Sequence, residues 1–403
     1  MQRRSVVLLC SFSLVGCGVE ETARDLPFEV EALDETFEDD EEEVEEDEPE
    51  APEVDHSDAL DAYILGLGYL DLPPVAGKHE IVCDPMQMEC PEPWAAGNLT
   101  CALQWYEQTQ HLDTFIALAP DSPALWPGAI IRGGEVMDGF LSPIGLERAP
   151  ATFSLSLEAL SASPVATMEV PSLSAFREAR NEILKGGLDG ATPAQMSYEI
   201  SRVHSRAELS IHVGVSLDWA GVLDFDAMFD FDDGEFGYRY LLDFKQTYYT
   251  ADLDTPPRPS DMFGRRVSVA DLEPHTSPGN PPVYVQSVAY GRRILFGIES
   301  DASLSEMVTA MDAALGGIAK LEANVGAKET LETSKITAAL LGGDGGAAVQ
   351  TIVSIDMLMD FITQGGNYSP DSPGAPIAYR LSYLDNATAR VALTAQYSKE
   401  VCQ

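Results

Sequence analysis

Hydrophobic and polar residues alternate from Leu209 to Asp232. Of the twelve odd positions from 209 to 231, eleven are apolar and the other is Gly221, whereas only three of the twelve even positions are apolar. This period of two is typical of β-strands with one apolar and one polar face. Two runs of about ten residues flank Ala220-Gly221-Val222, and about 9–11 residues suffice for a tilted membrane-spanning strand. The pattern predicts a transmembrane hairpin, with a soluble hairpin packed on one face as the alternative.

Residues 304–325 fit two periods at once. Five apolar residues recur at helical spacing: Leu304, Val308, Met311, Leu315 and Ile318. A second set shares one side of a strand: Met311, Ala313, Leu315, Ala319, Leu321, Ala323 and Val325. The Ala-rich and Leu-rich composition favours the helix. Compatibility with both periods is what a helix-to-strand switch requires, although an ordinary amphipathic helix has the same pattern.

The first 17 residues have the pattern of an export signal. Arg3 and Arg4 precede a short apolar core that cannot span a bilayer. The core ends in Leu14-Val15-Gly16-Cys17, which resembles a bacterial lipobox, where the Cys is lipidated and becomes the new N-terminus. An ordinary signal peptide is the alternative. Several acyl chains on Cys17 would anchor the chain stably, so we expect an exported protein at the outer membrane or cell surface, either retained or released.

Acidic residues are concentrated in one segment after the export signal. Positions 18–55 hold 20 acidic residues and one basic residue, Arg24. Such a segment cannot bury enough apolar surface to fold, so residues 18–57 are predicted to be a disordered tether, with an acidic interaction tail as the alternative. Residues 58–403 then form the folded core. The net charge of −42 excludes a nucleic-acid partner and electrostatic binding to anionic lipid, because both require basic surfaces.

The chain contains no recognisable catalytic constellation. The nucleophile motifs, the phosphate-binding loop and zinc-type His spacing are missing from the sequence. We therefore expect no enzyme, no cofactor and no metal site. Cys83, Cys90, Cys101 and Cys402 remain beyond the signal and the lipobox, and an even number in an exported protein predicts two disulfides with three possible connectivities.

Five short blocks carry a family resemblance. They are LWPGA (residues 125–129), DFKQTYYT (243–250), PVYVQSVAYGR (282–292), LGGD (341–344) and PGAPIAY (373–379). Each block alone is modest, but together and in this order they resemble the thiol-activated (cholesterol-dependent) cytolysins of the membrane-attack-complex/perforin superfamily. Residues 61–65 similarly resemble the family's first helix. The resemblance extends over about residues 60–403.

The resemblance implies an α+β fold in which two helical clusters flank a bent, twisted antiparallel central sheet, with an elongated β linker region. In the family, each cluster unfolds into a transmembrane β-hairpin upon ring assembly, since only a closed ring of strands satisfies every backbone group in lipid. The clusters map onto about residues 205–232 and 303–328. The membrane-inserting residues so implied are Leu209, Ile211, Val213, Val215, Leu217, Trp219, Leu223, Phe225, Phe229, Phe231, Met311, Leu315 and Leu321.

The resemblance also assigns smaller features. Gly342 and Gly343 would ease the bend of the central sheet. The disulfides would be Cys83–Cys90 and Cys101–Cys402, because the family's strands near these last two positions lie together in the linker. The family's cholesterol-recognising C-terminal β-sandwich has no expected counterpart, since the four Trp residues (94, 105, 126 and 219) cannot form its Trp-rich loop.

Together these observations predict a pore-forming lipoprotein that acts on a target membrane and assembles with copies of itself. Without a sterol-binding domain, we expect it to need activation or a partner subunit for recognition of the target. The alternative is a non-lytic surface lipoprotein that uses the same fold for binding, scaffolding or regulation of a related cytolysin.

Overall fold

The computed structural model describes most of the chain after the acidic segment. The described residues are 55–86, 90–136, 139–157, 160–161, 163–187, 194–215, 225–231, 236–341, 349–363, 367–369 and 373–403. Cys17, the export signal and the tether up to residue 54 lie outside them. Within them, no helix is long and apolar enough to cross a membrane.

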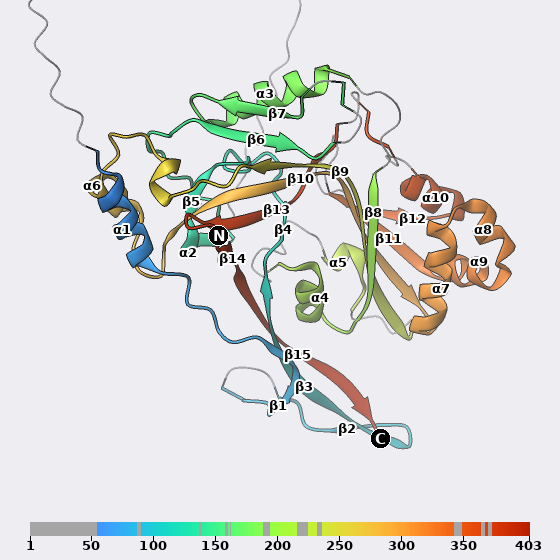
Figure 1. Ribbon diagram of the computed structural model, residues 1–403. Helices are drawn as coiled ribbons and strands as arrows, with labels where there is room; N and C mark the ends of the chain where they lie inside the picture. The colour runs from blue at the N-terminus through green and yellow to red at the C-terminus, as the bar shows by residue number, and fades with distance from the viewer. Residues whose placement is uncertain are drawn as a thin grey trace, which may run out of the picture. The chain divides into compact units, whose positions relative to one another are not determined.

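An antiparallel sheet forms the centre of the fold (Figure 1), as the α+β expectation required. Its longest strands, β9 (Tyr238–Leu253) and β10 (Pro282–Ser300), pair with each other from Tyr238 to Asp252. The other described strands of this sheet are β4 (Phe115–Ile116), β5 (Ile130–Arg132), β6 (Ala151–Leu155), β7 (Val165–Met168), β8 (Gln195–Val203), β11 (Lys335–Leu341), β12 (Val349–Ile352), β13 (Ala375–Tyr383) and β14 (Thr388–Ala389).

The sheet changes partners half-way along β10. On one edge, β10 pairs with β13 from Val283 to Gly291 and with β11 from Arg293 to Glu299. The register against β9 shifts between Tyr290 and Gly291. A Cβ atom at Gly291 would lie 2.0 Å from the carbonyl oxygen of Gln246, so only glycine lets the two backbones approach this closely.

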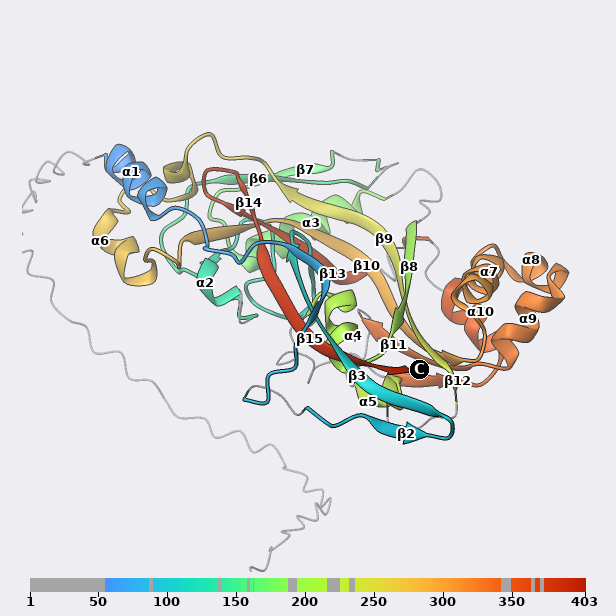
Figure 2. The same cartoon turned by 90° about the horizontal axis from the view of Figure 1, so that it is seen from below.

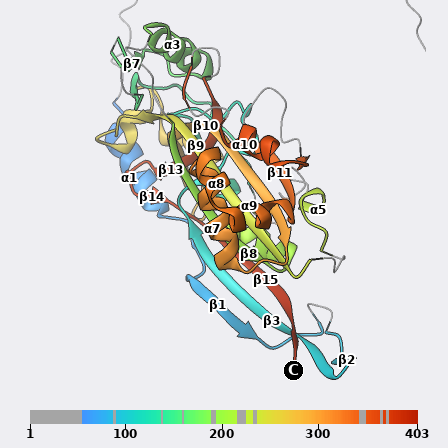
Figure 3. The same ribbon diagram turned by 90° about the vertical axis from the view of Figure 1, so that its right-hand side faces the viewer.

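A second, four-stranded sheet extends from the main sheet and corresponds to the expected β linker (Figures 1 and 3). In it, β3 (Leu99–Leu112) lies between β1 (Ala76–Ile81) and β15 (Val391–Cys402), and β2 (Trp94–Ala96) also pairs with β3. The disulfides are Cys83–Cys90 and Cys101–Cys402, which is the pairing that the resemblance implied. The second joins the facing ends of β3 and β15.

Short helices pack against the core of the main sheet. They are α1 (Ser57–Leu67), α3 (Leu173–Lys185), α6 (Val269–Leu272) and α2 (Gly133–Val136), of which α2 lies near the linker, because Val136 and Leu393 of β15 line one pocket. Phe176 of α3 packs edge-on against Phe153 of β6, with ring centroids 5.0 Å apart. Leu125 and Trp126, from the LWPGA block, are buried in the same core, so this block is a packing element of the fold.

Candidate functional site: two helical connections on opposite faces of the sheet

Two connections of equal length join neighbouring strands. Residues 204–237 connect β8 to β9, and residues 301–334 connect β10 to β11, so each is 34 residues long. The first contains α4 (Arg206–Val213) and α5 (Phe225–Met228). The second contains α7 (Leu304–Leu315), α8 (Ile318–Ala323) and α9 (Val325–Glu332). These are the two helical clusters that the resemblance implied.

The clusters pack on opposite faces of the same three strands. Leu241, Leu295 and Ala339 contact the first connection, whereas their neighbours Leu242, Ile294 and Ala338 contact the second. Because successive side chains of a strand point to opposite faces, one cluster covers each side. Figures 1 and 2 show α4 and α5 on one side of β9–β11 and α7–α9, with α10 (Ile355–Thr363), on the other.

The alternating segment begins as a helix, not as the strand that its period predicted. Ser205 caps α4 by accepting a hydrogen bond from the backbone N of Glu208, and Gly214 ends it in the left-handed conformation. Residues 209 and 213 fall on one helical face and residue 211 on the opposite face. Leu209 and Val213 pack on the main sheet, whereas Ile211 packs on Leu393 and Ala395 of β15. A helix buried on two sides therefore accepts the alternating pattern.

Most described members of the predicted membrane-inserting set are buried here. Leu209, Ile211, Val213, Val215, Phe229, Met311 and Leu321 are buried, and Phe231 and Leu315 are half-buried. Phe225 begins α5, but its side chain, like Leu217, Trp219 and Leu223, lies outside the described residues, as do Gly342 and Gly343. The described members of the set thus lie in the core or at its border in this conformation.

Polar contacts tie α4 to the linker sheet. Lys78 of β1 places its Nζ 3.3 Å from Oε1 of Glu208 and lies over the rings of Tyr106 and Tyr397. The Nε2 of Gln110 donates to the carbonyl oxygen of Ile211 at 2.6 Å. Burial opposes ionisation of Glu208, but hydrogen bonds from His204 and the charge of Lys78 lower its pKa to about 2.

The end of α5 is held by the main sheet. Thr337 Oγ1 donates to the carbonyl oxygen of Met228 at 2.8 Å, and a Cβ at Gly297 would lie 2.7 Å from the same oxygen. The backbone N of Asp230 donates to Oε1 of Glu299 at 3.2 Å, and Arg239 donates to the Asp230 carbonyl. These contacts fix the chain just before β9.

Buried charges lie on the face of the main sheet that packs against the first connection. Arg293 donates two hydrogen bonds to Asp243, at 2.8 and 2.7 Å, and Lys245 Nζ lies 3.0 Å from the same carboxylate. Burial raises the pKa of Asp243, but Arg293 and Lys245 outweigh it, so the pKa is lowered. The sequence analysis quoted Asp243 and Lys245 only within a resemblance block and did not predict their pairing with Arg293, which depends on the register between β9 and β10.

The second connection confirms the helical conformation expected over residues 304–325, although it is divided among α7, α8 and α9, but it does not confirm the expected buried face. Ser303 and Glu306 form a capping box at the start of α7. Leu304 and Ile318 are 43% and 44% exposed, so the helical stripe expected through them is wrong. The buried stripe of α7 is Met307, Ala310, Met311 and Ala314. It is rotated because small alanines let α7 approach Phe296 and Ile298 closely.

Strand β8 is an edge of the main sheet that also contacts α7. Within the described residues it pairs with β9 alone, from Gln195 to Val203. Met196 and Tyr198 are 59% and 39% exposed. The Tyr198 hydroxyl donates a short hydrogen bond to Asp312 of α7. On the opposite edge, the four residues of β12 cover Ile336–Ala339 of β11.

One group among the described residues has metal-like spacing: Cys101, Glu400 and Cys402. Its two sulfurs are joined in a disulfide and are therefore unavailable as thiolate ligands.

Comparison with known proteins matches the chain to cytolysins. The family described as thiol-activated cytolysin matches residues 108–401. Pneumolysin of Streptococcus pneumoniae is 32% identical over 284 residues, covering 67% of this chain and 59% of that protein. Tetanolysin of Clostridium tetani is 33% identical over 284 residues, covering 68% and 53%. The chain thus spans between about half and three-fifths of the length of these curated relatives.

Solved structures of cytolysins also match the chain. A pneumolysin structure superposes with a TM-score of 0.67 at 26% identity, and that of the human-specific toxin intermedilysin with 0.67 at 27%. Each covers 86% of this chain, which covers 75% of theirs. These relatives are cytolysins and not enzymes. On sequence and fold together, the chain belongs to the thiol-activated cytolysin family.

Proposed function

We propose that the chain forms membrane pores by converting its two helical connections into transmembrane β-hairpins. The observation that supports this most directly is connectivity. Each connection joins two adjacent antiparallel strands, so extending β8 with β9, and β10 with β11, absorbs both connections into longer hairpins without any change in topology. Half of 34 residues exceeds the roughly 9–11 residues that a membrane-spanning strand needs.

The apolar residues support the same conversion. Leu209 and Val213 of α4, and Val215 just beyond it, are buried against the main sheet, whereas Ile211 is buried against β15. In an extended strand they would all lie on one face, towards lipid. Self-assembly is supported by β8, because an exposed strand edge is a template for pairing with another chain.

Dye release from liposomes tests this proposal. A disulfide engineered between α4 and β15, which pack together, would block release, and reductant would restore it. Wild-type protein treated with reductant controls for the native disulfides. Release that is indifferent to the closed lock would contradict the proposal and favour a scaffold that never inserts.

Anchoring and targeting are separate proposals. We propose that Cys17 is lipidated at the outer membrane or cell surface, and that a partner subunit or an activation step supplies recognition of the target. Mass spectrometry of the exported chain tests the first, with Cys17→Ala as the matched control. For the second, release should rise when proteins encoded nearby are added.

A further inference from the structure

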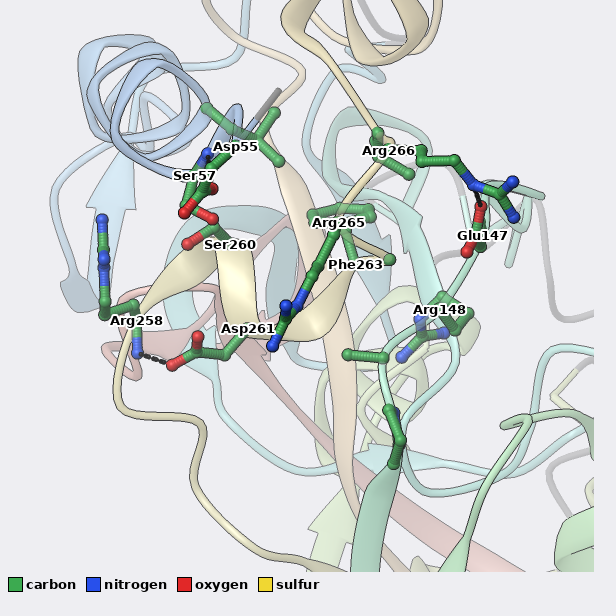
Figure 4. Close-up of a pocket in the computed structure, with 15 residues that line it drawn as sticks. Asp55, Ser57, Glu147, Arg148, Arg258, Ser260, Asp261, Phe263, Arg265 and Arg266 are labelled. Atoms are coloured by element: carbon green, nitrogen blue, oxygen red, sulfur yellow. Dashed lines mark hydrogen bonds and ion pairs between the residues drawn. The ribbon is translucent and has the colours of Figure 1, made fainter. Parts of the chain in front are cut away.

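A pocket of about 680 Å³ lies on the part of the molecule remote from the linker sheet. It is bounded by the start of α1, by residues 147–150 and by the segment 258–267 (Figure 4). It contains no residue of the two helical connections. Its volume is within the range of about 300–1,000 Å³ that is usual for small-molecule sites.

Four arginines line this pocket in an otherwise acidic protein. They are Arg148, Arg258, Arg265 and Arg266, out of 24 lysines and arginines in the chain. Figure 4 shows Arg258 and Asp261 on one side, Arg266 with Glu147 on the other, and Arg148 and Arg265 between them.

The acidic residues of the pocket are engaged locally. Asp55 accepts from the backbone N of Ser57 at 2.9 Å, and Asp261 accepts from the backbone N of Arg258 at 3.0 Å. Glu147 lies 3.4 Å from Arg266. Arg258 is itself paired outwards with two aspartates of α1.

Two guanidinium groups form no ion pair with a described carboxylate, although the charge of Arg265 acts on Asp55 at longer range. Arg148 donates to the carbonyl oxygens of Met262, at 2.8 Å, and Gly128, at 2.7 Å. These neutral groups do not offset its charge, and burial lowers its pKa to about 10. Arg265 is exposed and forms no ion pair within the described part of the chain. The buried hydroxyl of Ser260, in the same wall, also has no partner among described residues.

We propose that this pocket binds a phosphate group carried on a small polar molecule. Arg148 is half-buried and Arg265 is exposed, and a phosphate between them would supply a counter-charge that the described carboxylates do not give Arg148. Guanidinium groups suit phosphate because they donate two parallel hydrogen bonds to it. The inference is independent of the proposed pore, since the pocket lies outside the converting segments.

Calorimetry and thermal unfolding of the purified full chain test the site, with inorganic pyrophosphate as the probe and sodium chloride at matched ionic strength. We expect saturable binding and a raised Tm. Arg265→Ala should weaken binding at least tenfold with little effect on folding, since the side chain is exposed and forms no ion pair or hydrogen bond with the described residues. Glu147→Gln should tighten binding several-fold by removing a repulsive charge. Arg390→Ala, an exposed arginine outside the pocket, should bind as wild type.

A second arm identifies the source of the phosphate. Sedimentation with phosphatidylcholine vesicles containing phosphatidic acid, lost in Arg265→Ala, would support a lipid headgroup as the ligand. Pyrophosphate binding without vesicle binding would support a soluble ligand. Binding to neither probe, or equal binding by Arg265→Ala and wild type, would overturn the proposal.

Discussion

Single charged residues hold the first helical connection in place. Glu208 is 5% exposed, yet it bridges α4 to β1 through Lys78. Asp243 is similarly buried beside Arg293 in the main sheet. Such pairs contribute little net stability when intact, but breaking one leaves an uncompensated buried charge. Substituting one partner of such a pair is therefore expected to lower the free energy of unfolding by much more than a substitution at the surface.

Glu208→Gln should lower the free energy of unfolding by about 2 kcal/mol at neutral pH, the scale of hydrogen bonds to a charged group. The pKa of Glu208 is depressed to about 2 in the folded chain, so the carboxylate stabilises the fold above its unfolded pKa of about 4.5. This contribution should disappear as the pH falls from about 4.5 to 2. Denaturant titrations across that range should show wild type converging on the variant. A constant difference would contradict the assignment.

Asp243→Asn should lower the free energy of unfolding by about 3–5 kcal/mol, because Arg293 would stay buried without its counter-charge. Replacing both partners, as Asp243→Leu with Arg293→Met, should recover most of the loss. The control is Asp254→Asn, at an exposed position, with an expected change within about 0.5 kcal/mol. Urea unfolding measures all three. A double variant no more stable than Asp243→Asn would refute the argument.

At the scale of elements, the close approach of β9 and β10 sets the partner change in the sheet. Gly291→Ala would place a Cβ against the Gln246 carbonyl, and we expect a loss of at least about 3 kcal/mol. Gly145→Ala is the matched control, because nothing lies within 4 Å of its Cβ; it should be neutral or slightly stabilising. Similar losses in both variants, measured by thermal unfolding, would exclude the steric explanation.

The packing of helices and strands also explains which features of the site the sequence could predict and which it could not. The helical conformation of 304–325 was predictable, because its Ala-rich and Leu-rich composition favours a helix locally, although the structure divides it among α7, α8 and α9. Its buried face was not, since it depends on which side chains of β10 it meets. The period of two over 209–231 predicts a strand, yet over Leu209–Val213 a helix packed on two sides accepts the same residues. The ion pairs of Asp243 and Glu299 depend on register between distant strands, which no local pattern contains.

For the molecule as a whole, the expected α+β architecture and both disulfide pairings could be inferred because a family resemblance supplied the topology. Composition alone predicted neither the architecture nor the disulfide pairings. The arginine pocket was not foreseen, because its residues come from three separate segments. Cys101–Cys402 spans 301 positions of the sequence and Cys83–Cys90 spans seven, so the two bonds constrain the unfolded chain very differently.

Replacing both cysteines of each bond by serine should separate these effects. We expect a loss of about 2–4 kcal/mol for Cys101–Cys402 and a smaller loss for Cys83–Cys90, because a longer closed loop restricts the unfolded state more. Guanidinium unfolding of the two double variants, each against wild type, provides the comparison. The reverse order would contradict this account.

The hydrogen bond between Tyr198 and Asp312 bears on the order of strand docking and helix unfolding in the proposed pore assembly. It links the open edge of the sheet to the helix α7 on one face. In the proposed assembly, a strand that pairs with β8 would lie beside Tyr198, and loss of its hydrogen bond would release one contact of α7 with the edge of the sheet. Under that proposal, docking of a neighbour would come before unfolding of α7, and an isolated copy would keep its apolar segments buried.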